Sequence, residues 1–93
     1  MTTLSDSLAA SGWALSDDGK AITKTFRFAD FRDAMAWMMR AGFEAEAADH
    51  HPEWFNVYNR VEVKLTTHDT GGLSDKDTAL AARFDAIAPA PKS

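Results

Sequence analysis

All three histidines of this 93-residue chain fall in one stretch, which runs from Glu46 to Asp77. His50 and His51 are adjacent, and His68 lies nearer the other end of the stretch. Histidine has an unperturbed pKa near physiological pH, and it is therefore the usual carrier of protons at a neutral-pH active site. The clustering makes acid–base chemistry by imidazoles our first hypothesis for this chain.

Two carboxylates and one aromatic ring of the stretch could support such chemistry. Glu46 and His50 are four residues apart, so on a helix they would share a face, and the carboxylate could orient the ring. Asp77 could reach the histidines only through tertiary structure, and by itself it is well explained as a charge at a helix start. Trp54 could offer a flat apolar surface to a heteroaromatic ring, or it could belong to the core.

Two other interpretations of the histidines stay open. Three neutral imidazoles with one open position form a known catalytic zinc arrangement, although adjacent histidines rarely bind one ion together. Alternatively, His50 and His51 mark only the end of a helix, and His68 is a surface residue at a strand end. The chain has no cysteine, which excludes a thiol nucleophile, a disulfide and a cysteine-ligated metal.

The hydrophobic pattern predicts the elements that must position these side chains. The expected order is a short helix over 3–10, strands over 13–15 and 21–28, a long helix from Phe31 to about Asp49, strands over 54–58 and 61–67 joined at Asn59-Arg60, and a last helix capped by Ser74. The long helix passes through Gly42, and a break there is the alternative. Pro52 cannot sit inside a helix and favours extended geometry at His51, so we expect this helix to end at the histidine pair.

This order, strand-strand-helix-strand-strand-helix with room for a short leading helix, predicts an α+β fold. The hairpins imply antiparallel pairing, and the physical solution is one four-stranded antiparallel sheet with its helices packed on one face. We expect residues 1–93 to form a single domain. A chain of this length buries only roughly 60–65% of its unfolded surface, so its core is small and self-association would help it.

Composition narrows the classes of function. The net charge of −4 argues against direct binding of nucleic acid, which normally needs a basic surface. Met1–Ala10 lacks the apolar core of a signal peptide, and no apolar run approaches the ~20 residues of a membrane span. We therefore expect a cytoplasmic protein without a membrane association.

The motif as a whole is more specific than its single residues. Three residues separate Glu46 from His50-His51-Pro52, and Tyr58, His68 and Asp77 follow at fixed distances. This pattern resembles the pterin-4a-carbinolamine dehydratase family, also known as dimerisation cofactors of a homeodomain transcription factor. Further matching motifs cover nearly the whole chain: Gly12-Trp13, Phe26-Arg27-Phe28, Phe31, Tyr58-Asn59, Thr67-His68-Asp69 and Gly71-Gly72-Leu73. The chain departs from the family at Gly42 and in a short N-terminal segment.

The resemblance implies a hydro-lyase that converts 4a-hydroxytetrahydropterin to quinonoid dihydropterin and water. Such an enzyme recycles tetrahydrobiopterin for aromatic amino-acid hydroxylases, to which it would be functionally linked. The family implies that His50 and His68 act as acid and base and that His51 orients the pterin. It implies supporting roles in substrate binding for Glu46, Pro52, Trp54 and Asp77. No metal or cofactor is implied, since the pterin is the substrate.

The sequence also predicts a homo-oligomer. Four large apolar side chains point around more than half of the circumference of the long helix: Met35, Trp37, Met38 and Met39. The side that covers the sheet should need only part of this apolar surface. An exposed apolar remainder usually marks an interface, and the resemblance implies a homodimer or homotetramer. The alternative function is a non-catalytic interaction or regulatory module of the same fold, although such a module would not need three titratable rings.

Overall fold

The structure is a computed structural model, and it describes residues 3–89. Its elements, in chain order, are α1 (Asp6–Ala10), β1 (Ala14–Leu15), β2 (Ile22–Arg27), α2 (Phe31–Ala47), β3 (Glu53–Val57), β4 (Arg60–Leu65), the 3₁₀ helix η1 (His68–Thr70) and α3 (Asp75–Ala86). This order confirms the predicted one, including the short leading helix.

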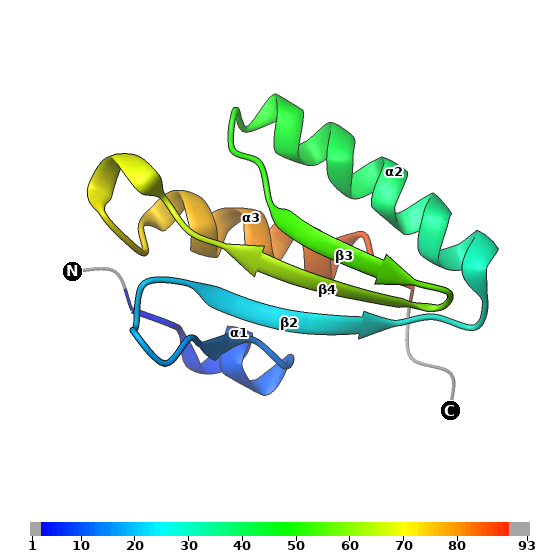
Figure 1. Cartoon of the computed structure of the whole chain (residues 1–93), viewed down its shortest axis with the longest axis horizontal. Coiled ribbons are helices and arrows are strands. Elements are labelled where there is room, and N and C mark those ends of the chain that lie inside the picture. The colour runs from blue at the N-terminus through cyan, green and yellow to red at the C-terminus, as the bar shows by residue number, and fades with distance from the viewer. Residues whose placement is uncertain (1–2, 90–93) are drawn as a thin grey trace.

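The four strands form one antiparallel sheet in the order β1-β2-β4-β3 (Figure 1). The central pair, β2 and β4, is aligned over its whole length, from Ile22 opposite Leu65 to Arg27 opposite Arg60. The helices α2 and α3 contact each other, α2 contacts β4, and α1 packs on α3. The predicted α+β class, with a four-stranded antiparallel sheet and packed helices, is therefore confirmed.

Alternating side chains explain why the sheet has one covered and one open face. In β2, Ile22 and Phe26 are buried, whereas Arg27 is exposed. The same period of two places Val61, Val63 and Leu65 of β4 in the core. Such alternation is what an antiparallel sheet with one solvated face requires.

Trp37 of α2 lies at the centre of the core. Its ring centroid is 4.4 Å from that of Phe26 on β2 and 5.6 Å from that of Phe84 on α3. Its indole N–H donates to the Phe84 carbonyl oxygen at 3.1 Å, so the buried polar atom is satisfied. One side chain thus joins the sheet to both long helices.

Each α-helix begins at a side chain that caps it. Ser5, Asp30 and Ser74 each accept a hydrogen bond from a backbone N–H of the first turn, which satisfies a donor that has no partner inside the helix. The helix α1 therefore begins at Asp6, later than the predicted Thr3. The helix α2 continues through Gly42, so the prediction of one unbroken helix is confirmed.

Several predicted boundaries were wrong, and two of them lie at residues with left-handed backbone. Another is the end of β4, which is at Leu65 and not at Thr67. The helix α2 ends at Ala47 and not at the histidine pair, because Asp49 adopts φ 51° and turns the chain away. The turn between β3 and β4 is built on Tyr58, at φ 49°, and Asn59, so Arg60 already belongs to β4. Non-glycine residues adopt such angles in only a few per cent of cases, which is why the pattern did not indicate them.

The outer face of α2 carries four exposed apolar residues at a spacing of four: Phe31, Met35, Met39 and Phe43, hereafter the α2 stripe. Trp37, one of the large apolar residues that point around the long helix, is only 2% exposed. It belongs to the core because it lies on the opposite side of the helix from Met39 and Phe43. Among residues 3–89, no helix has the length and apolar character to cross a membrane.

Candidate active site

A buried imidazole–carboxylate pair joins the segment that follows α2 to the start of α3. The Nε2 atom of His50 lies 2.5 Å from Oδ1 of Asp77. The side chain of Asp77 is fully buried and that of His50 is 11% exposed. The left-handed turn at Asp49 points the imidazole ring of His50 into the fold. The backbone N–H of His50 donates to the Ala45 carbonyl oxygen at 3.0 Å.

The second oxygen of Asp77 accepts two further hydrogen bonds. The Thr67 hydroxyl donates to Oδ2 at 2.8 Å, and the Ser74 backbone N–H donates to it at 2.9 Å. With the imidazole on Oδ1, the carboxylate has three donors, which is how a buried charge is tolerated without a large free-energy penalty. Asp77 is therefore more than the helix-start charge that its position suggested.

Glu46 pairs with His51, not with His50 as its spacing of four had suggested. Its Oε1 atom lies 2.8 Å from His51 Nε2. Because α2 ends at Ala47 and the chain reverses at Asp49, the four-residue rule for helices no longer applies to His50. The side chains of His51 and Glu46 are 60% and 79% exposed, so this pair is at the surface.

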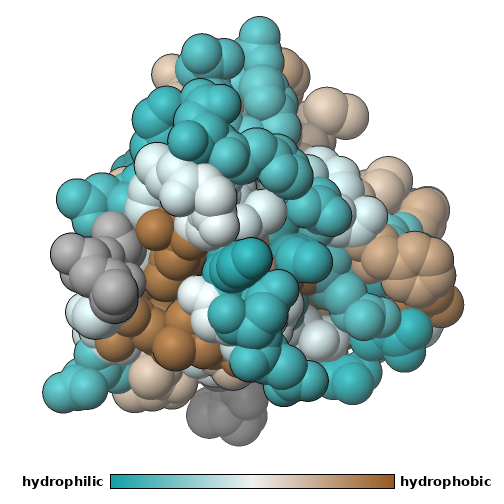
Figure 2. All heavy atoms as spheres, turned by 60° about the vertical axis from the view of Figure 1, so that its left-hand side comes forward, coloured by the Kyte–Doolittle hydropathy of each residue, from teal (hydrophilic) through white to brown (hydrophobic). Residues whose placement is uncertain are grey.

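His68 begins η1 and lies beside a cleft of about 370 Å³. The walls of the cleft carry several charged or polar residues: Asp18, Lys20, Glu53, Lys64 and Thr66. The surrounding side of the molecule is mainly hydrophilic, with apolar groups gathered at separate places (Figure 2).

One acidic group in this cleft is electrostatically perturbed. The pKa of the Asp18 carboxyl is lowered from its ordinary value, first by the Ser16 hydroxyl and then by the Lys20 backbone N–H, which both donate to Oδ1. Asp18 therefore carries its negative charge more firmly than a free aspartate does.

Two predicted substrate-binding residues lie next to the histidine pair in the chain but differ in burial. Pro52 links His51 to β3 and is partly buried. The Trp54 ring reaches toward α2 and packs near Trp37 and Phe84, with centroid distances of 6.3 and 6.5 Å. Trp54 is thus largely occupied by core packing, and its contact with a substrate remains a prediction.

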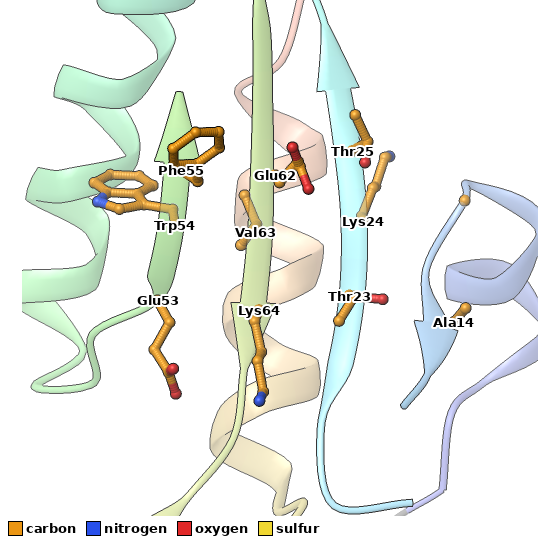
Figure 3. A pocket seen from close by; sticks show the side chains of 11 residues that line it. Ala14, Thr23, Lys24, Thr25, Glu53, Trp54, Phe55, Glu62, Val63 and Lys64 are labelled. Atoms are coloured by element: carbon orange, nitrogen blue, oxygen red, sulfur yellow. The ribbon is translucent and has the colours of Figure 1, made fainter. Parts of the chain in front are cut away.

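The open face of the sheet carries one exposed aromatic ring of β3. Phe55 is 59% exposed and stands in one row with Glu62 and Thr25 across the sheet (Figure 3). A broad hollow of about 740 Å³ lies over this face. Its lining includes Glu53 and Lys64, which also line the His68 cleft.

Thr67 connects the two histidines for which the family resemblance implies the roles of acid and base. It is hydrogen-bonded through Asp77 to His50, and it directly precedes His68 in the chain. The sequence reasoning missed Thr67 and Ser74 as members of the site. The capping pattern of Ser74 and Asp77 was visible, but nothing in the spacing indicated that Asp77 would also bind His50. Among residues 3–89, no three His, Cys, Asp or Glu side chains form a group that could hold a metal ion.

The fold and the site together define a class of protein. The chain is a small α+β protein in which a buried imidazole–carboxylate pair joins the segment after the long helix α2 to the first turn of α3. A family model described as pterin 4 alpha carbinolamine dehydratase matches residues 1–87. The chain therefore belongs to the pterin 4 alpha carbinolamine dehydratase family, and the resemblance stated from the motif is confirmed.

Individual relatives agree with this assignment. A candidate pterin-4-alpha-carbinolamine dehydratase of Novosphingobium aromaticivorans is 60% identical over 75 residues, which cover 81% of this chain and 78% of the relative. A candidate of the same description from Rhizobium johnstonii is 54% identical over 78 residues, covering 84% and 77%.

Two solved structures share the fold. A transcriptional coactivator/pterin dehydratase from Brucella melitensis aligns with a TM-score of 0.83 and 41% identity, covering 95% of this chain and all of that one. A pterin dehydratase-like protein described as a RuBisCO assembly factor in the alpha-carboxysome aligns with a TM-score of 0.73 over 86% of this chain and 93% of that one. At 22% identity, the second likeness concerns the fold alone.

Proposed function

We propose that this protein is a hydro-lyase that dehydrates 4a-hydroxytetrahydropterin to quinonoid dihydropterin. The observation that carries the proposal is the buried His50–Asp77 pair, which is hydrogen-bonded to Thr67, the residue directly before His68. The family assignment supports the pterin as the substrate class. The reaction would recycle the pterin used by an aromatic amino-acid hydroxylase, which we propose as a functional partner in the cytoplasm.

The reaction needs one acid and one base and no change in oxidation state. The C–O bond at the carbinolamine carbon breaks, a C=N bond forms to the neighbouring ring nitrogen, and that nitrogen loses its proton. The hydroxyl leaves as water after it has gained a proton, because hydroxide is a poor leaving group. Each such proton transfer by a positioned side chain contributes typically ~10²–10⁴-fold in rate.

The hydrogen bonds of His50 favour the role of base for this ring. With Nε2 donating to Asp77, the lone pair of neutral His50 is on Nδ1, and the carboxylate would stabilise the imidazolium that forms when Nδ1 takes a proton. His68, which lies at the polar cleft, would then supply the proton to the leaving hydroxyl. His51, held by Glu46, would orient the pterin at the surface, with Pro52 and Trp54 supporting the pocket.

Turnover of carbinolamine generated in situ tests the proposal directly. We expect acceleration by the wild-type protein without added metal, and a loss of roughly 10-fold or more in His50→Ala and in His68→Ala. His51→Ala should mainly raise KM. Wild-type rates in both single variants, or activity that a chelator removes and zinc restores, would refute the assignment.

The α2 stripe supports a second candidate function, which is that of a protein-interaction module. Four exposed apolar residues along one helix face form the kind of surface that usually marks an interface. A module of this kind could regulate a partner without turning over pterin. The same turnover assay separates the two candidates, since a pure module would leave the uncatalysed rate unchanged.

A further inference from the structure

Thr67 and Ser74 surround the oxygen of Asp77 that faces away from His50, and neither has a role in the reaction as described so far. We propose that Thr67, supported by Ser74, is a positioning residue that holds Asp77 so that His50 keeps the tautomer needed for catalysis. The kinetic test of this inference rests on the proposed function. The test by the tautomer of His50 does not.

The direction of the hydrogen bonds follows from counting protons. The Thr67 hydroxyl has one proton, and it goes to Asp77 Oδ2 at 2.8 Å because a carboxylate oxygen only accepts. The Ser74 hydroxyl, 2.6 Å from Thr67 Oγ1, must therefore donate to Thr67. Ser74 Oγ in turn accepts from the Lys76 N–H at 3.3 Å. The result is one directed series of hydrogen bonds that ends on the carboxylate, and such series strengthen each member.

This arrangement leaves only one oxygen of Asp77 for the imidazole. Thr67 and the Ser74 N–H occupy Oδ2, so Oδ1 accepts from His50 Nε2. A carboxylate fixed in this way selects the tautomer of His50 with its proton on Nε2. Nδ1 then keeps its lone pair, and among residues 3–89 no hydrogen bond to Nδ1 occurs. The hydroxyl of Thr67 thus acts on the reacting atoms through Asp77 and not by contact.

Helix capping alone does not account for Thr67. The cap of α3 needs only Ser74 and Asp77, which are bonded to each other. Thr67 lies two residues after the end of β4 and ten residues before Asp77, and it is buried. Its backbone forms both hydrogen bonds of a bridge with Gly72, which closes the loop that carries His68. Thr67 is therefore placed to fix both histidines relative to each other.

A pair of substitutions separates the hydroxyl from the shape of the side chain. Thr67→Val keeps the branched shape and removes the hydroxyl, whereas Thr67→Ser keeps the hydroxyl. We expect Thr67→Val to lower kcat about 10-fold, with KM within about twofold, and Thr67→Ser to restore most of kcat. The pH profile of kcat should also move in Thr67→Val and not in Thr67→Ser, which a purely structural role would not produce.

Thr78→Val is the matched control, because it makes the same chemical change one residue after Asp77. The Thr78 hydroxyl donates to the Asp75 carbonyl oxygen at 3.2 Å and has no bond to Asp77. Thermal unfolding of all variants shows whether each is folded at the assay temperature. If Thr67→Val matches Thr78→Val in kcat and in pH profile, the inference is wrong.

A second measurement does not depend on activity. Nitrogen-15 NMR of labelled histidine reports which ring nitrogen carries the proton, and we expect the Nε2–H tautomer of His50 in wild type, Thr67→Ser and Thr78→Val. In Thr67→Val we expect a mixture of tautomers. If the wild-type protein does not turn over pterin, the proposed function is wrong. The tautomer of His50 still tests the present inference in that case. An unchanged tautomer in Thr67→Val overturns it.

Ser74 provides the test if Thr67→Val does not fold. Ser74→Ala removes the donor to Thr67 but keeps the backbone N–H on Asp77, and Ser74→Thr restores the hydroxyl. We expect a smaller loss of kcat, about threefold, in Ser74→Ala and its recovery in Ser74→Thr. Equal kcat and equal tautomer populations in Ser74→Ala and wild type would overturn the proposal.

Discussion

The two oxygens of Asp77 bind different parts of the molecule. One accepts from His50, and the other accepts from Thr67 and from the backbone N–H of Ser74. Because Asp77 stabilises α3 and orients the ring of His50 at the same time, few side chains could replace it. The first prediction at this scale therefore concerns the amide that has the same shape as the carboxylate.

Asp77→Asn should place its amide oxygen toward Ser74, because a backbone N–H can only donate. The NH₂ group must then face His50 and donate to Nε2, which puts the imidazole proton on Nδ1 and removes the proposed base. We expect kcat to fall by at least about 100-fold with little change in KM. Steady-state kinetics measure this effect, with circular dichroism as the control for folding; a loss below threefold would contradict the assigned role of Asp77.

The pH dependence of turnover belongs to the same scale. One imidazole must be neutral and another protonated for the two proton transfers, so the plot of enzymatic rate against pH should be bell-shaped. The profile reports the coupled histidines and not one ring. The uncatalysed dehydration also depends on pH and must be subtracted. A flat enzymatic profile between pH 5 and 9 would contradict acid–base catalysis by histidine.

At the scale of elements, α2 decides where the site residues lie. Its periodicity was readable, as was the capping of α3 by Ser74, because both follow from local spacing. The pairing of His50 with Asp77 was not readable, since it depends on the left-handed turn at Asp49 and on contact between segments 27 residues apart. Spacing alone predicted that Glu46 would pair with His50, whereas in the structure Glu46 pairs with His51. Sequence periodicity thus predicted the helices and strands, and tertiary packing decided which side chains meet.

Gly42 provides a prediction about α2 itself. A Cβ built at this position would be 3.9 Å from the nearest atom of Trp54, which is an ordinary van der Waals contact, and the backbone is helical. Gly42→Ala should therefore stabilise the protein by about 0.5–1 kcal/mol, because alanine loses less backbone entropy in a helix. Urea unfolding measures the change. Destabilisation by Gly42→Ala would mean that Trp54 cannot accommodate the methyl group.

At the scale of the whole molecule, the α2 stripe is an apolar surface that the isolated chain leaves exposed. Met39 and Phe43 are 64% and 68% exposed, and burying them against a second copy would offset the small core of a chain this short. We propose that the protein is a homo-oligomer with at least a dimer as its unit.

Sedimentation equilibrium at micromolar concentration tests the oligomer. We expect a mass of at least twice the 10.2 kDa of one chain, which should fall toward that of the monomer in Met39→Glu and Phe43→Glu. Ala82→Glu, at an exposed position of α3, is the matched control and should keep the wild-type mass. Trp37→Glu should unfold the protein, since Trp37 is in the core. A wild-type mass of one chain would contradict the oligomer.

The first turn of α3 has a consequence for the lifetime of the assembled site. Its cap and the anchor of His50 are the same carboxylate, so fraying of this single turn would release the ring without any global unfolding. Helix termini open far more often than cores do. The fraction of time that His50 spends in its working orientation is then limited by local opening at Ser74–Asp77, and a bound pterin that contacts His50 would in return slow the exchange of amide hydrogens in that turn.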